Sequence, residues 1–396
     1  MAERLAVDGG RPVRATPLPY GRHAVDEDDV QAVVAALRSG WLTTGPQVPA
    51  FETAVARQVG AAHAVAVSSG TAALHCAAFA AGVGPGDEVI VPAITFAATA
   101  NAACYLGATP VFADVRPDTL NVDPDDVARR LTPRTRAVMA VDFAGQPSDV
   151  DALADLARGR GAALIEDAAH ALGAEHRGRR VGALADLTTF SFHPVKHVTT
   201  GEGGLVTTED EGLAGRLRRF RNHGLEAEFR ERDARGLAYA PMVDLGYNYR
   251  ISDLACALGL AQLPRLEGLL KRRAEIAQRY RAELGGVAGL ELPAVAPHVR
   301  HAWHIFPVLL DLGRIRADRG AVLAALRAEG IGAAVHYVPV YWHPYYEARG
   351  YRRGLCPRAE AAFERLLTLP LFPTMAEADV DDVVVAVRKV LGHYAR

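Results

Sequence analysis

Short apolar runs alternate with longer stretches of helical periodicity between about residues 26 and 255. The runs that predict buried strands are 64–69, 87–93, 109–115, 136–143 and 162–168. The stretches between them, such as “GTAALHCAAFAAG” after the first run, predict helices. Continuous apolar strands that alternate with helices are typical of a largely parallel sheet covered on both faces. Ligands of such sheets bind beyond the carboxyl ends of the strands.

The pattern changes after about residue 256. The segment “LACALGLAQLPRLEGLLKRRAEIAQRYRAEL” predicts a long amphipathic helix that is bent or broken at Pro264. A strand-like “HAWHIFPVLL”, another helix, the aromatic run “HYVPVYWHPYY” and a final helix follow. We therefore expect an N-terminal arm over residues 1–25, a large α/β domain over 26–255 and a small α+β domain over 256–396.

Composition and charge narrow the class of protein. Half of the 396 residues are hydrophobic and 23% are charged, as in soluble globular proteins. The formal net charge of −2 gives no electrostatic reason to expect nucleic acid or a membrane surface as a partner. The first residues lack the apolar core of a signal peptide, and we expect no membrane span. The four cysteines are isolated, so we expect buried thiols and a cytoplasmic location.

Lysine is rare in this chain, and one lysine stands in unusual surroundings. Only Lys196, Lys271 and Lys389 occur among 44 basic residues. An arginine stays protonated, whereas a lysine amine can lose its proton and form a Schiff base with a carbonyl. Lys271 and Lys389 lie in helical patterns and fit solvated surface positions. Lys196 lies within “FSFHPVKHVTTGEGG”, among histidines, a proline and a glycine-rich turn, which leaves a surface amine and a functional amine equally open.

The segment “SSGTAAL” places Ser69, Gly70 and Thr71 between a predicted strand and a predicted helix. Free N–H groups and the helix dipole make such a turn suitable for a phosphate, although Ser and Thr are also ordinary helix caps. It is not a Walker A loop, because no Gly-Lys-Ser/Thr follows.

Asp167, in “ALIEDAAHALGA”, ends a predicted strand. A carboxylate there can serve a cofactor or a metal, or can cap the next helix. A metal site with His193 and His197 is disfavoured, because Pro194 disrupts the helix that an i, i+4 ligand pair needs. We expect no metal.

Together these features fit pyridoxal 5′-phosphate (PLP). Lys196 would supply the imine, the Ser-Gly-Thr turn would hold the phosphate, and Asp167 would keep the pyridine nitrogen protonated. An aromatic ring is needed to stack on the pyridine face, and Phe96 of “PAITFAATAN” is placed for this role.

The chain resembles the DegT/StrS-type sugar aminotransferases in “SSGTAAL”, “PAITFAATANA”, “EDAAHALGAE”, “SFHPVKHVTTGEGG” and “LGYNYRISDLACALGLAQL”. The resemblance runs from about Tyr20 to the last helix. It implies the aspartate aminotransferase (type I) fold, with a mostly parallel seven-stranded sheet between helices and a smaller C-terminal α+β domain. Within the family, “FAGQPSDVDAL” and “AAVHYVPVYWHPYY” look most similar to the pseudaminic acid pathway aminotransferase, which aminates C4 of a UDP-linked 4-keto-6-deoxy N-acetyl sugar.

The resemblance also implies site residues. Lys196 corresponds to the internal aldimine lysine and Asp167 to the partner of the pyridinium. The other implied cofactor contacts are Ser69, Gly70, Thr71, Phe96, His170, Ser191 and Asn248. Asn248 would reach the cofactor of the neighbouring subunit, which implies an obligate homodimer with shared active sites. The implied substrate contacts are Tyr20, Gly40, Trp41, Leu42, Thr43, Arg250, His336 and Tyr337. Arg250 would meet the carboxylate of the amino donor, or form a structural ion pair.

The implied reaction is a ping-pong transfer of an amino group from L-glutamate to a nucleotide-linked keto sugar, through pyridoxamine 5′-phosphate. Related sugar dehydratases carry histidine in place of the lysine, so Lys196 favours transamination. Alternatives are a dTDP-linked keto sugar or a keto-cyclitol as the acceptor. A non-catalytic PLP-binding regulator is less favoured, because neither end of the chain carries a basic DNA-binding segment.

Overall fold

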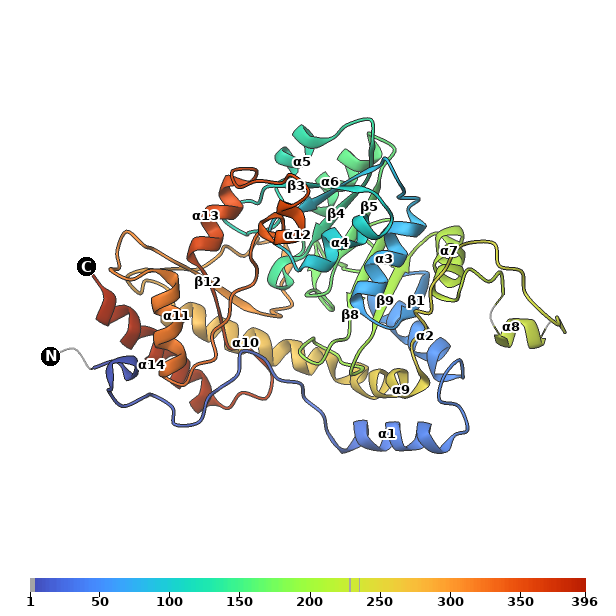
Figure 1. Ribbon diagram of the computed structural model, residues 1–396. Helices are drawn as coiled ribbons and strands as arrows, with labels where there is room; N and C mark the ends of the chain where they lie inside the picture. The colour runs from blue at the N-terminus through green and yellow to red at the C-terminus, as the bar shows by residue number, and fades with distance from the viewer. Residues whose placement is uncertain (1–3, 228, 235) are drawn as a thin grey trace.

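The computed structural model describes residues 4–227, 229–234 and 236–396, and a seven-stranded sheet lies at its centre (Figure 1). The strands follow the order β1-β9-β8-β5-β4-β2-β3. Their bounds are β1 (His63–Val67), β2 (Glu88–Pro92), β3 (Thr109–Ala113), β4 (Thr135–Val141), β5 (Ala163–Asp167), β8 (Leu187–Ser191) and β9 (Gly204–Thr208). The five strands from β8 to β3 pair in parallel, and β9 is antiparallel to both of its neighbours. The predicted mostly parallel sheet is confirmed.

Helices cover both faces of this sheet because the strands are apolar on both sides. One face packs against α3 (Gly70–Ala80), α4 (Ala97–Tyr105) and α7 (Glu211–Arg221). The other face packs against α2 (Gln47–Val59), α5 (Pro124–Arg130), α6 (Val150–Arg158) and α9 (Asp253–Gln262). In addition, α1 (Glu27–Arg38) packs on α9, and the short α8 (Phe229–Ala234) follows α7.

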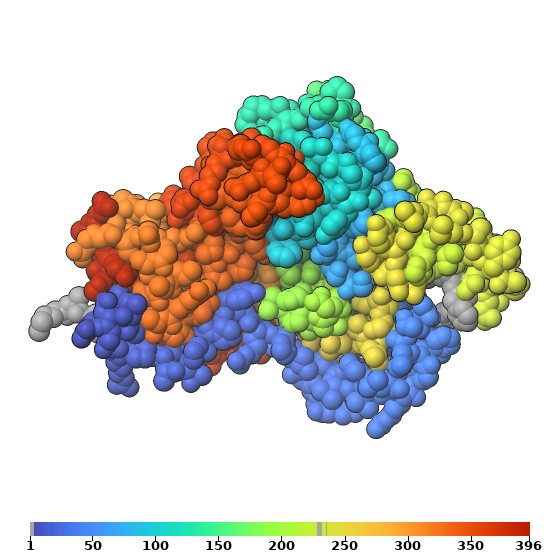
Figure 2. Space-filling view, viewed as in Figure 1, coloured from blue at the N-terminus to red at the C-terminus, as the bar shows by residue number. Residues whose placement is uncertain are grey.

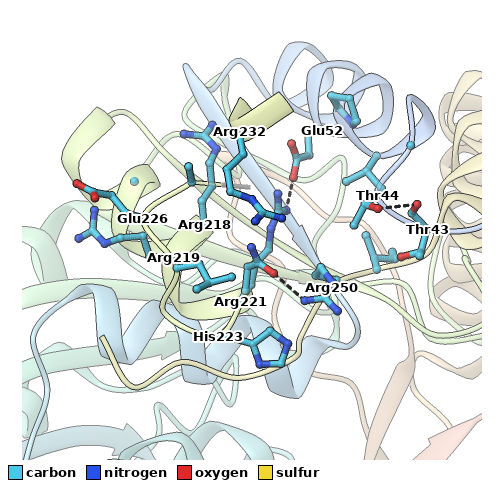
Figure 3. A pocket seen from close by; sticks show the side chains of 18 residues that line it. Thr43, Thr44, Glu52, Arg218, Arg219, Arg221, His223, Glu226, Arg232 and Arg250 are labelled. Carbon is cyan, nitrogen blue, oxygen red and sulfur yellow. Dashed lines mark hydrogen bonds and ion pairs between the residues drawn. The ribbon is translucent and has the colours of Figure 1, made fainter. Parts of the chain in front are cut away.

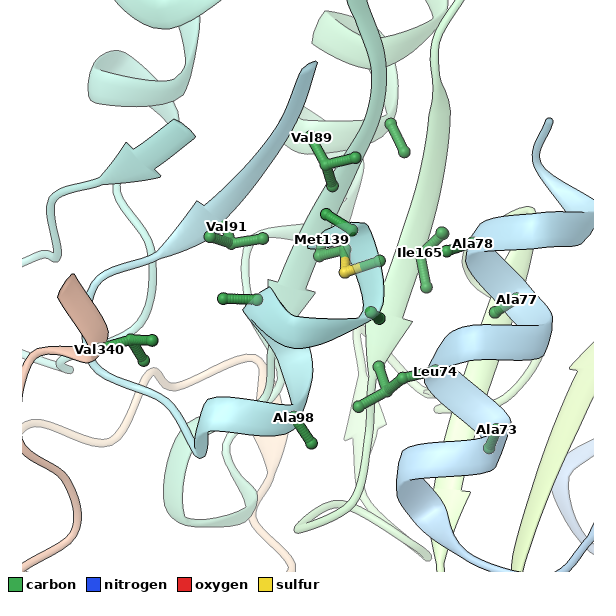
Figure 4. Packing of buried hydrophobic residues seen from close by; sticks show 14 of the residues in the cluster. Ala73, Leu74, Ala77, Ala78, Val89, Val91, Ala98, Met139, Ile165 and Val340 are labelled. Carbon is green, nitrogen blue, oxygen red and sulfur yellow. The ribbon is translucent and has the colours of Figure 1, made fainter. Parts of the chain in front are cut away.

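The close approach of α3 to the sheet comes from its small side chains. Figure 4 shows Leu74, Ala77 and Ala78 facing Ile165 of β5 and Met139 of β4. Ala77 and Ala78 are fully buried, so no larger side chain holds the helix away from the strands. This packing fixes the start of α3 near the carboxyl ends of the central strands.

The C-terminal part has its own core and sheet. The break predicted at Pro264 is a 3₁₀ turn, Leu263–Arg265, between α9 and α10 (Leu266–Leu284). An antiparallel sheet combines β10 (Leu290–Glu291), β12 (Phe306–Leu310) and β13 (Leu366–Leu369). The remaining helices are α11 (Arg319–Ala328), α12 (Pro344–Glu347), α13 (Pro357–Arg365) and α14 (Glu377–Tyr394). Three short strands, β6 (Glu175–His176), β7 (Arg179–Arg180) and β11 (Val299–Arg300), form a third sheet.

Two details differ from the sequence-based expectations, and the packing of the N-terminal arm adds a third. The strand-like run over 301–310 is a strand only from Phe306, because its first residues cross toward the large sheet. Cys104 is partly exposed, so the expectation of four buried thiols is wrong for that cysteine. The N-terminal arm packs on the C-terminal core through Leu5 and Leu18. Within the described residues, no helix is long and apolar enough to cross a membrane.

Candidate active site

A cavity of about 450 Å³ lies beyond the carboxyl ends of β1, β2, β4, β5 and β8. Most of the predicted site residues line it: Tyr20, Ser69, Gly70, Thr71, Phe96, Asp167, His170, Ser191, Lys196, His336 and Tyr337. They come from the arm, from four strand ends of the large sheet and from the C-terminal part. The chain fold therefore brings together segments that are more than 300 residues apart in sequence.

Lys196 lies on the connection between β8 and β9. A turn bond from its N–H to the carbonyl of His193 (2.9 Å) and a bond from Thr200 N–H to Phe192 O (3.0 Å) shape this connection. The Lys196 Nζ lies 3.4 Å from Nε2 of His304. Burial lowers the pKa of the Lys196 amine to about 8, although the charge of Asp167 opposes this shift. A measurable fraction of the amine is therefore neutral near pH 7.

Asp167 is the last residue of β5, and hydrogen bonds fix its carboxylate. Oδ2 accepts a hydrogen bond from the Thr99 hydroxyl (2.7 Å), and Oδ1 accepts one from the N–H of Ala169 (3.2 Å). The Thr99 hydroxyl also lies 2.8 Å from that of Thr95. Burial raises the pKa of Asp167, while Thr99, Ala169 and the charge of Lys196 lower it. A buried carboxylate of this kind is stabilised by a cation, such as a protonated ring nitrogen.

The start of α3 forms a narrow cradle against the end of β8. Ser69 caps the helix, because its hydroxyl accepts the N–H of Ala72 (3.1 Å). A Cβ at Gly70 would lie 2.9 Å from the Cβ of Ser191 and 3.1 Å from its Oγ. Residue 70 must therefore be glycine for the Ser191 hydroxyl to face the free N–H groups of the helix start. This combination suits a phosphate.

Histidines form the wall behind the amine. His170 Nε2 lies 3.2 Å from the Tyr337 hydroxyl, and the rings of His170 and His304 are 4.3 Å apart. Burial and the charge of Lys196 lower the pKa of both histidines, so both rings are neutral near pH 7. Nδ1 of each ring is buried and has no hydrogen-bond partner within the described part of the chain. These atoms are available to a bound group.

His197 is engaged elsewhere, since its Nε2 donates to the carbonyl of Ala302 (2.9 Å). Among the residues that the structure describes, no group of three or more His, Cys, Asp or Glu side chains could hold a metal ion.

Aromatic rings line the mouth of the cavity. The Phe96 ring is 60% exposed and lies 6.0 Å from the ring of Tyr337. The Tyr20 ring lies 5.1 Å from that of His336. Phe96 precedes α4 and leaves a broad apolar face free for a flat ring.

Six predicted residues lie outside this cavity: Gly40, Trp41, Leu42, Thr43, Asn248 and Arg250. Thr43 and Arg250 line a second cavity of about 780 Å³, which is rich in arginine (Figure 3). Arg250 donates to the side-chain oxygen of Asn222 (2.7 Å), and Asn248 pairs with Asn222 through the backbone. A single chain therefore does not bring these six residues to the Lys196 cavity, and the expectation that Asn248 serves the neighbouring subunit stays a prediction. Within the described residues, the hydrogen-bond partner of the Arg250 side chain is an amide, and its role toward the carboxylate of the amino donor stays a prediction.

Two cavity residues that contact the predicted Lys196 and Asp167 side chains were not predicted from the sequence. His304 contacts Lys196, and Thr99 contacts Asp167. Thr95 precedes α4 and Thr99 lies in its first turn, so helical spacing alone does not predict the contact between their hydroxyls. Nothing in “HAWHIFPVLL” indicates that His304 reaches the amine, because that contact joins residues 108 positions apart.

Comparison with known proteins gives a consistent result. A model of the DegT/DnrJ/EryC1/StrS aminotransferase family matches residues 23–388. The spore coat polysaccharide biosynthesis protein SpsC of Bacillus subtilis is 44% identical over 377 residues, which cover 94% of this chain and 97% of SpsC. The structure of DesI in the presence of its TDP-sugar product is 35% identical, with a TM-score of 0.88, and the match covers 98% of this chain and 97% of DesI. PseC of Helicobacter pylori, an aminotransferase involved in the biosynthesis of pseudoaminic acid, is 28% identical with a TM-score of 0.89, covering 96% of this chain and all of PseC.

The cavity fits the cofactor of that family, which is PLP. The cradle at Gly70 excludes any side chain, the buried carboxylate of Asp167 calls for a cation, and the Nδ1 atom of His170 lacks a partner in the described structure. With residues 23–388 matched by the family model and 44% identity to SpsC, this chain belongs to the DegT/DnrJ/EryC1/StrS aminotransferase family and is a PLP-dependent sugar aminotransferase.

Proposed function

We propose that this protein transfers the amino group of L-glutamate to C4 of a UDP-linked 4-keto-6-deoxy-N-acetylhexosamine. The observation that carries the proposal is the buried amine of Lys196, whose pKa is lowered to about 8. Such an amine can take up and release a proton near neutral pH, as amino transfer in both directions requires. Similarity to PseC, together with the segment that carries His336 and Tyr337, supports the UDP-linked acceptor.

Several residues of the cavity have roles in this proposal. The start of α3 and the Ser191 hydroxyl bind the cofactor phosphate, and Asp167 keeps the ring nitrogen protonated. When PLP is bound, it supplies an electron sink for the carbon that loses its proton. Phe96 covers one face of the ring and excludes water from it. The neutral ring of His304 accepts a hydrogen bond from the Lys196 amine. This contact orients the amine so that the nitrogen lone pair of Lys196 points into the cavity.

Lys196 carries the proton. Its neutral Nζ accepts the proton that Cα of the amino donor loses, and the resulting ammonium returns a proton later in the cycle. With the acceptor sugar the same atom moves the proton in the opposite sense. An arginine could not replace it, because a guanidinium does not give up its proton near pH 7.

We infer that the working form is a homodimer in which Asn248 and Arg250 of one subunit complete the site of the other. In one chain both lie outside the Lys196 cavity. The segment over residues 236–247, which precedes Asn248, lies in the yellow region that projects from the body of the molecule (Figure 2). It exposes large apolar side chains, among them Tyr239 (74%), Met242 (64%) and Leu245 (80%). Several large exposed apolar side chains on one short segment support an interface there. The four free cysteines support a cytoplasmic location.

A dTDP-linked keto sugar is the second candidate acceptor, and the similarity to DesI favours it. DesI is 35% identical to this chain and has a TDP-sugar product, whereas PseC is 28% identical. A keto-cyclitol is the third acceptor to test.

A substrate panel decides among these acceptors. The purified protein, loaded with PLP, is incubated with L-glutamate and with UDP-linked 4-keto sugars, dTDP-linked 4-keto sugars or a keto-cyclitol. Mass spectrometry then shows which compound exchanges a keto oxygen for an amino group. We expect the UDP-linked 4-keto-6-deoxy-N-acetylhexosamine to react fastest. Faster reaction of a dTDP-linked sugar would replace the first candidate with the second.

Substitution of the lysine tests the proposed chemistry. We expect Lys196→Arg to keep the fold but to lower turnover on the order of 10²- to 10⁴-fold, because the proton carrier is lost. The matched control is Lys271→Arg, an exposed position on α10. Initial rates of 2-oxoglutarate formation measure both variants. Near wild-type turnover in Lys196→Arg would show that the amine is not the proton carrier.

A further inference from the structure

One cavity between the large sheet and the C-terminal part has no part in the proposed reaction. It measures about 660 Å³ and lies between the edge strand β3, the end of α4 and residues 345–355. Figure 2 shows the orange-red segment around α12 packed against the cyan region of α4. We call this cavity the tyrosine–arginine groove, after five of its lining residues, Arg130, Tyr345, Tyr346, Arg349 and Tyr351.

The groove combines positive charge with exposed aromatic surface. No aspartate or glutamate lines it. The Arg349 guanidinium lies 3.5 Å from the centre of the Tyr345 ring, which is 46% exposed, and it donates to the Tyr345 carbonyl (3.0 Å). Within the described part of the chain, no carboxylate forms an ion pair with Arg349, whereas Arg130 is paired with Asp126. Arg349 therefore presents an uncompensated charge beside a stacking surface.

We propose that the tyrosine–arginine groove binds a nucleoside diphosphate at a site separate from the Lys196 cavity. A flat base would extend the stack on Tyr345, and the diphosphate would meet the guanidinium groups. The choice of a nucleoside diphosphate, among planar anions, rests on the proposed use of a nucleotide-linked sugar. Free nucleotide and intact nucleotide sugar share this chemistry.

Two connections join the groove to the active cavity. The Tyr346 hydroxyl donates to the side-chain oxygen of Asn101 (2.7 Å) on α4, the helix whose Thr99 holds Asp167. The segment that ends at the groove begins with His336 and Tyr337 in the active cavity. A ligand in the groove would therefore contact the segment that leads to the aromatic wall and the helix whose Thr99 holds Asp167.

Cys104 provides a local reporter. It lines the groove and is partly exposed, whereas the other three cysteines are buried. Because burial raises the pKa of the Cys104 thiol, alkylation is measured at about pH 9. The PLP-loaded protein is treated with iodoacetamide, with or without uridine diphosphate, thymidine diphosphate, UDP-N-acetylglucosamine or inorganic pyrophosphate. Peptide mass spectrometry gives the rate at Cys104.

We expect nucleoside diphosphates to slow alkylation of Cys104 in a saturable way. Arg349→Ala and Tyr345→Ala should each raise the half-protecting concentration by about tenfold or more. Arg38→Ala, an exposed arginine at the end of α1, is the control for lost charge and should not change it. Equal protection in wild type and Arg349→Ala would overturn the proposal, and so would equal protection by pyrophosphate alone.

The nucleotide sugar arm identifies the source of the ligand, because protection by uridine diphosphate alone indicates the free nucleotide. The outcome is independent of the substrate panel. If the protein aminates a cyclitol but nucleotide still protects Cys104, the proposed nucleotide site stands and the proposed acceptor is wrong. If the protein aminates the UDP-linked sugar but nucleotide does not protect Cys104, the proposed acceptor stands and the proposed nucleotide site is wrong.

Discussion

At the scale of single residues, the chemistry depends on how burial changes ordinary side chains. Lys196 lies beside His304, whose ring packs on that of His170. Burial makes the ammonium form of Lys196 less stable, and the charge of Arg273 adds to this effect. Burial also disfavours the charged form of Asp167 and so raises its pKa. The hydrogen bond from Thr99 stabilises the carboxylate and lowers that pKa. The pair therefore keeps a titratable amine and a hydrogen-bonded carboxylate in one cavity of about 450 Å³.

Replacement of Thr99 by valine tests the support of Asp167 with little change in volume. The hydrogen bond from Thr99 lowers the pKa of Asp167, so its loss should raise that pKa. The carboxylate then becomes protonated at a higher pH, and the acidic limb of the kcat/KM profile should move upward. We also expect the Kd for PLP to rise about tenfold. Equilibrium dialysis and pH–rate profiles measure the two effects.

The control for this variant is Thr53→Val, an exposed threonine on α2 whose hydroxyl only bonds to the carbonyl of Pro49. An acidic limb that stays in place in Thr99→Val, with normal PLP affinity, would show that Thr99 does not support the carboxylate.

At the scale of elements, the start of α3 shows how backbone packing builds the site. The alanine-rich face of the helix lets it approach β4 and β5 closely, and that approach brings residue 70 against Ser191 at the end of β8. Ser69 is the N-cap residue at which α3 begins. The glycine is therefore required by contact with another strand and not by a left-handed backbone, since its φ is not positive.

Gly70→Ala should narrow the cradle. The added Cβ would lie 2.9 Å from the Cβ of Ser191, so strand and helix must separate. We expect a loss of about 1–3 kcal/mol in the free energy of unfolding, together with weaker PLP binding. Gly268→Ala in α10 is the matched control, because a Cβ there meets nothing within 4 Å and should stabilise the helix by about 0.5–1 kcal/mol. Chemical denaturation of the apoprotein and PLP titration measure both, and equal PLP affinity in the two variants would contradict the cradle.

At the scale of the whole molecule, one chain holds an incomplete set of the expected contacts. The arm, the large sheet and the C-terminal core converge on Lys196, while Arg250 lines a separate cavity and Asn248 lines neither of the two. Large apolar side chains of residues 239–245 are exposed in the single chain, and the proposed homodimer would bury them. Activity and assembly should therefore be linked.

Leu245→Arg tests this link. The side chain is 80% exposed in the single chain, and a charge there should prevent burial in an interface. We expect light scattering to show a monomer and turnover to fall on the order of 100-fold. Val385→Arg on α14, where valine is 50% exposed, should remain a dimer with normal turnover. A fully active monomer of Leu245→Arg would contradict the shared site.

The sequence by itself determined the alternating strands and helices, the helix break at Pro264 and the residues that end the strands at the cavity. These features depend on local periodicity, proline geometry and the fact that parallel strands end on one side of a sheet. Asp167 and the Ser-Gly-Thr turn follow predicted strands, whereas Lys196 was joined to them by the chemistry that PLP requires and by the resemblance to the DegT/StrS-type aminotransferases.

Only the tertiary structure decided which side chains meet. The contact of His304 with Lys196, the clash that requires glycine at residue 70 and the position of Arg250 in another cavity all join distant segments. Periodicity carries no information on such contacts, because they depend on how helices and strands pack against one another. The protonation of the site is decided in the same way, since burial in the folded chain sets the pKa of Lys196.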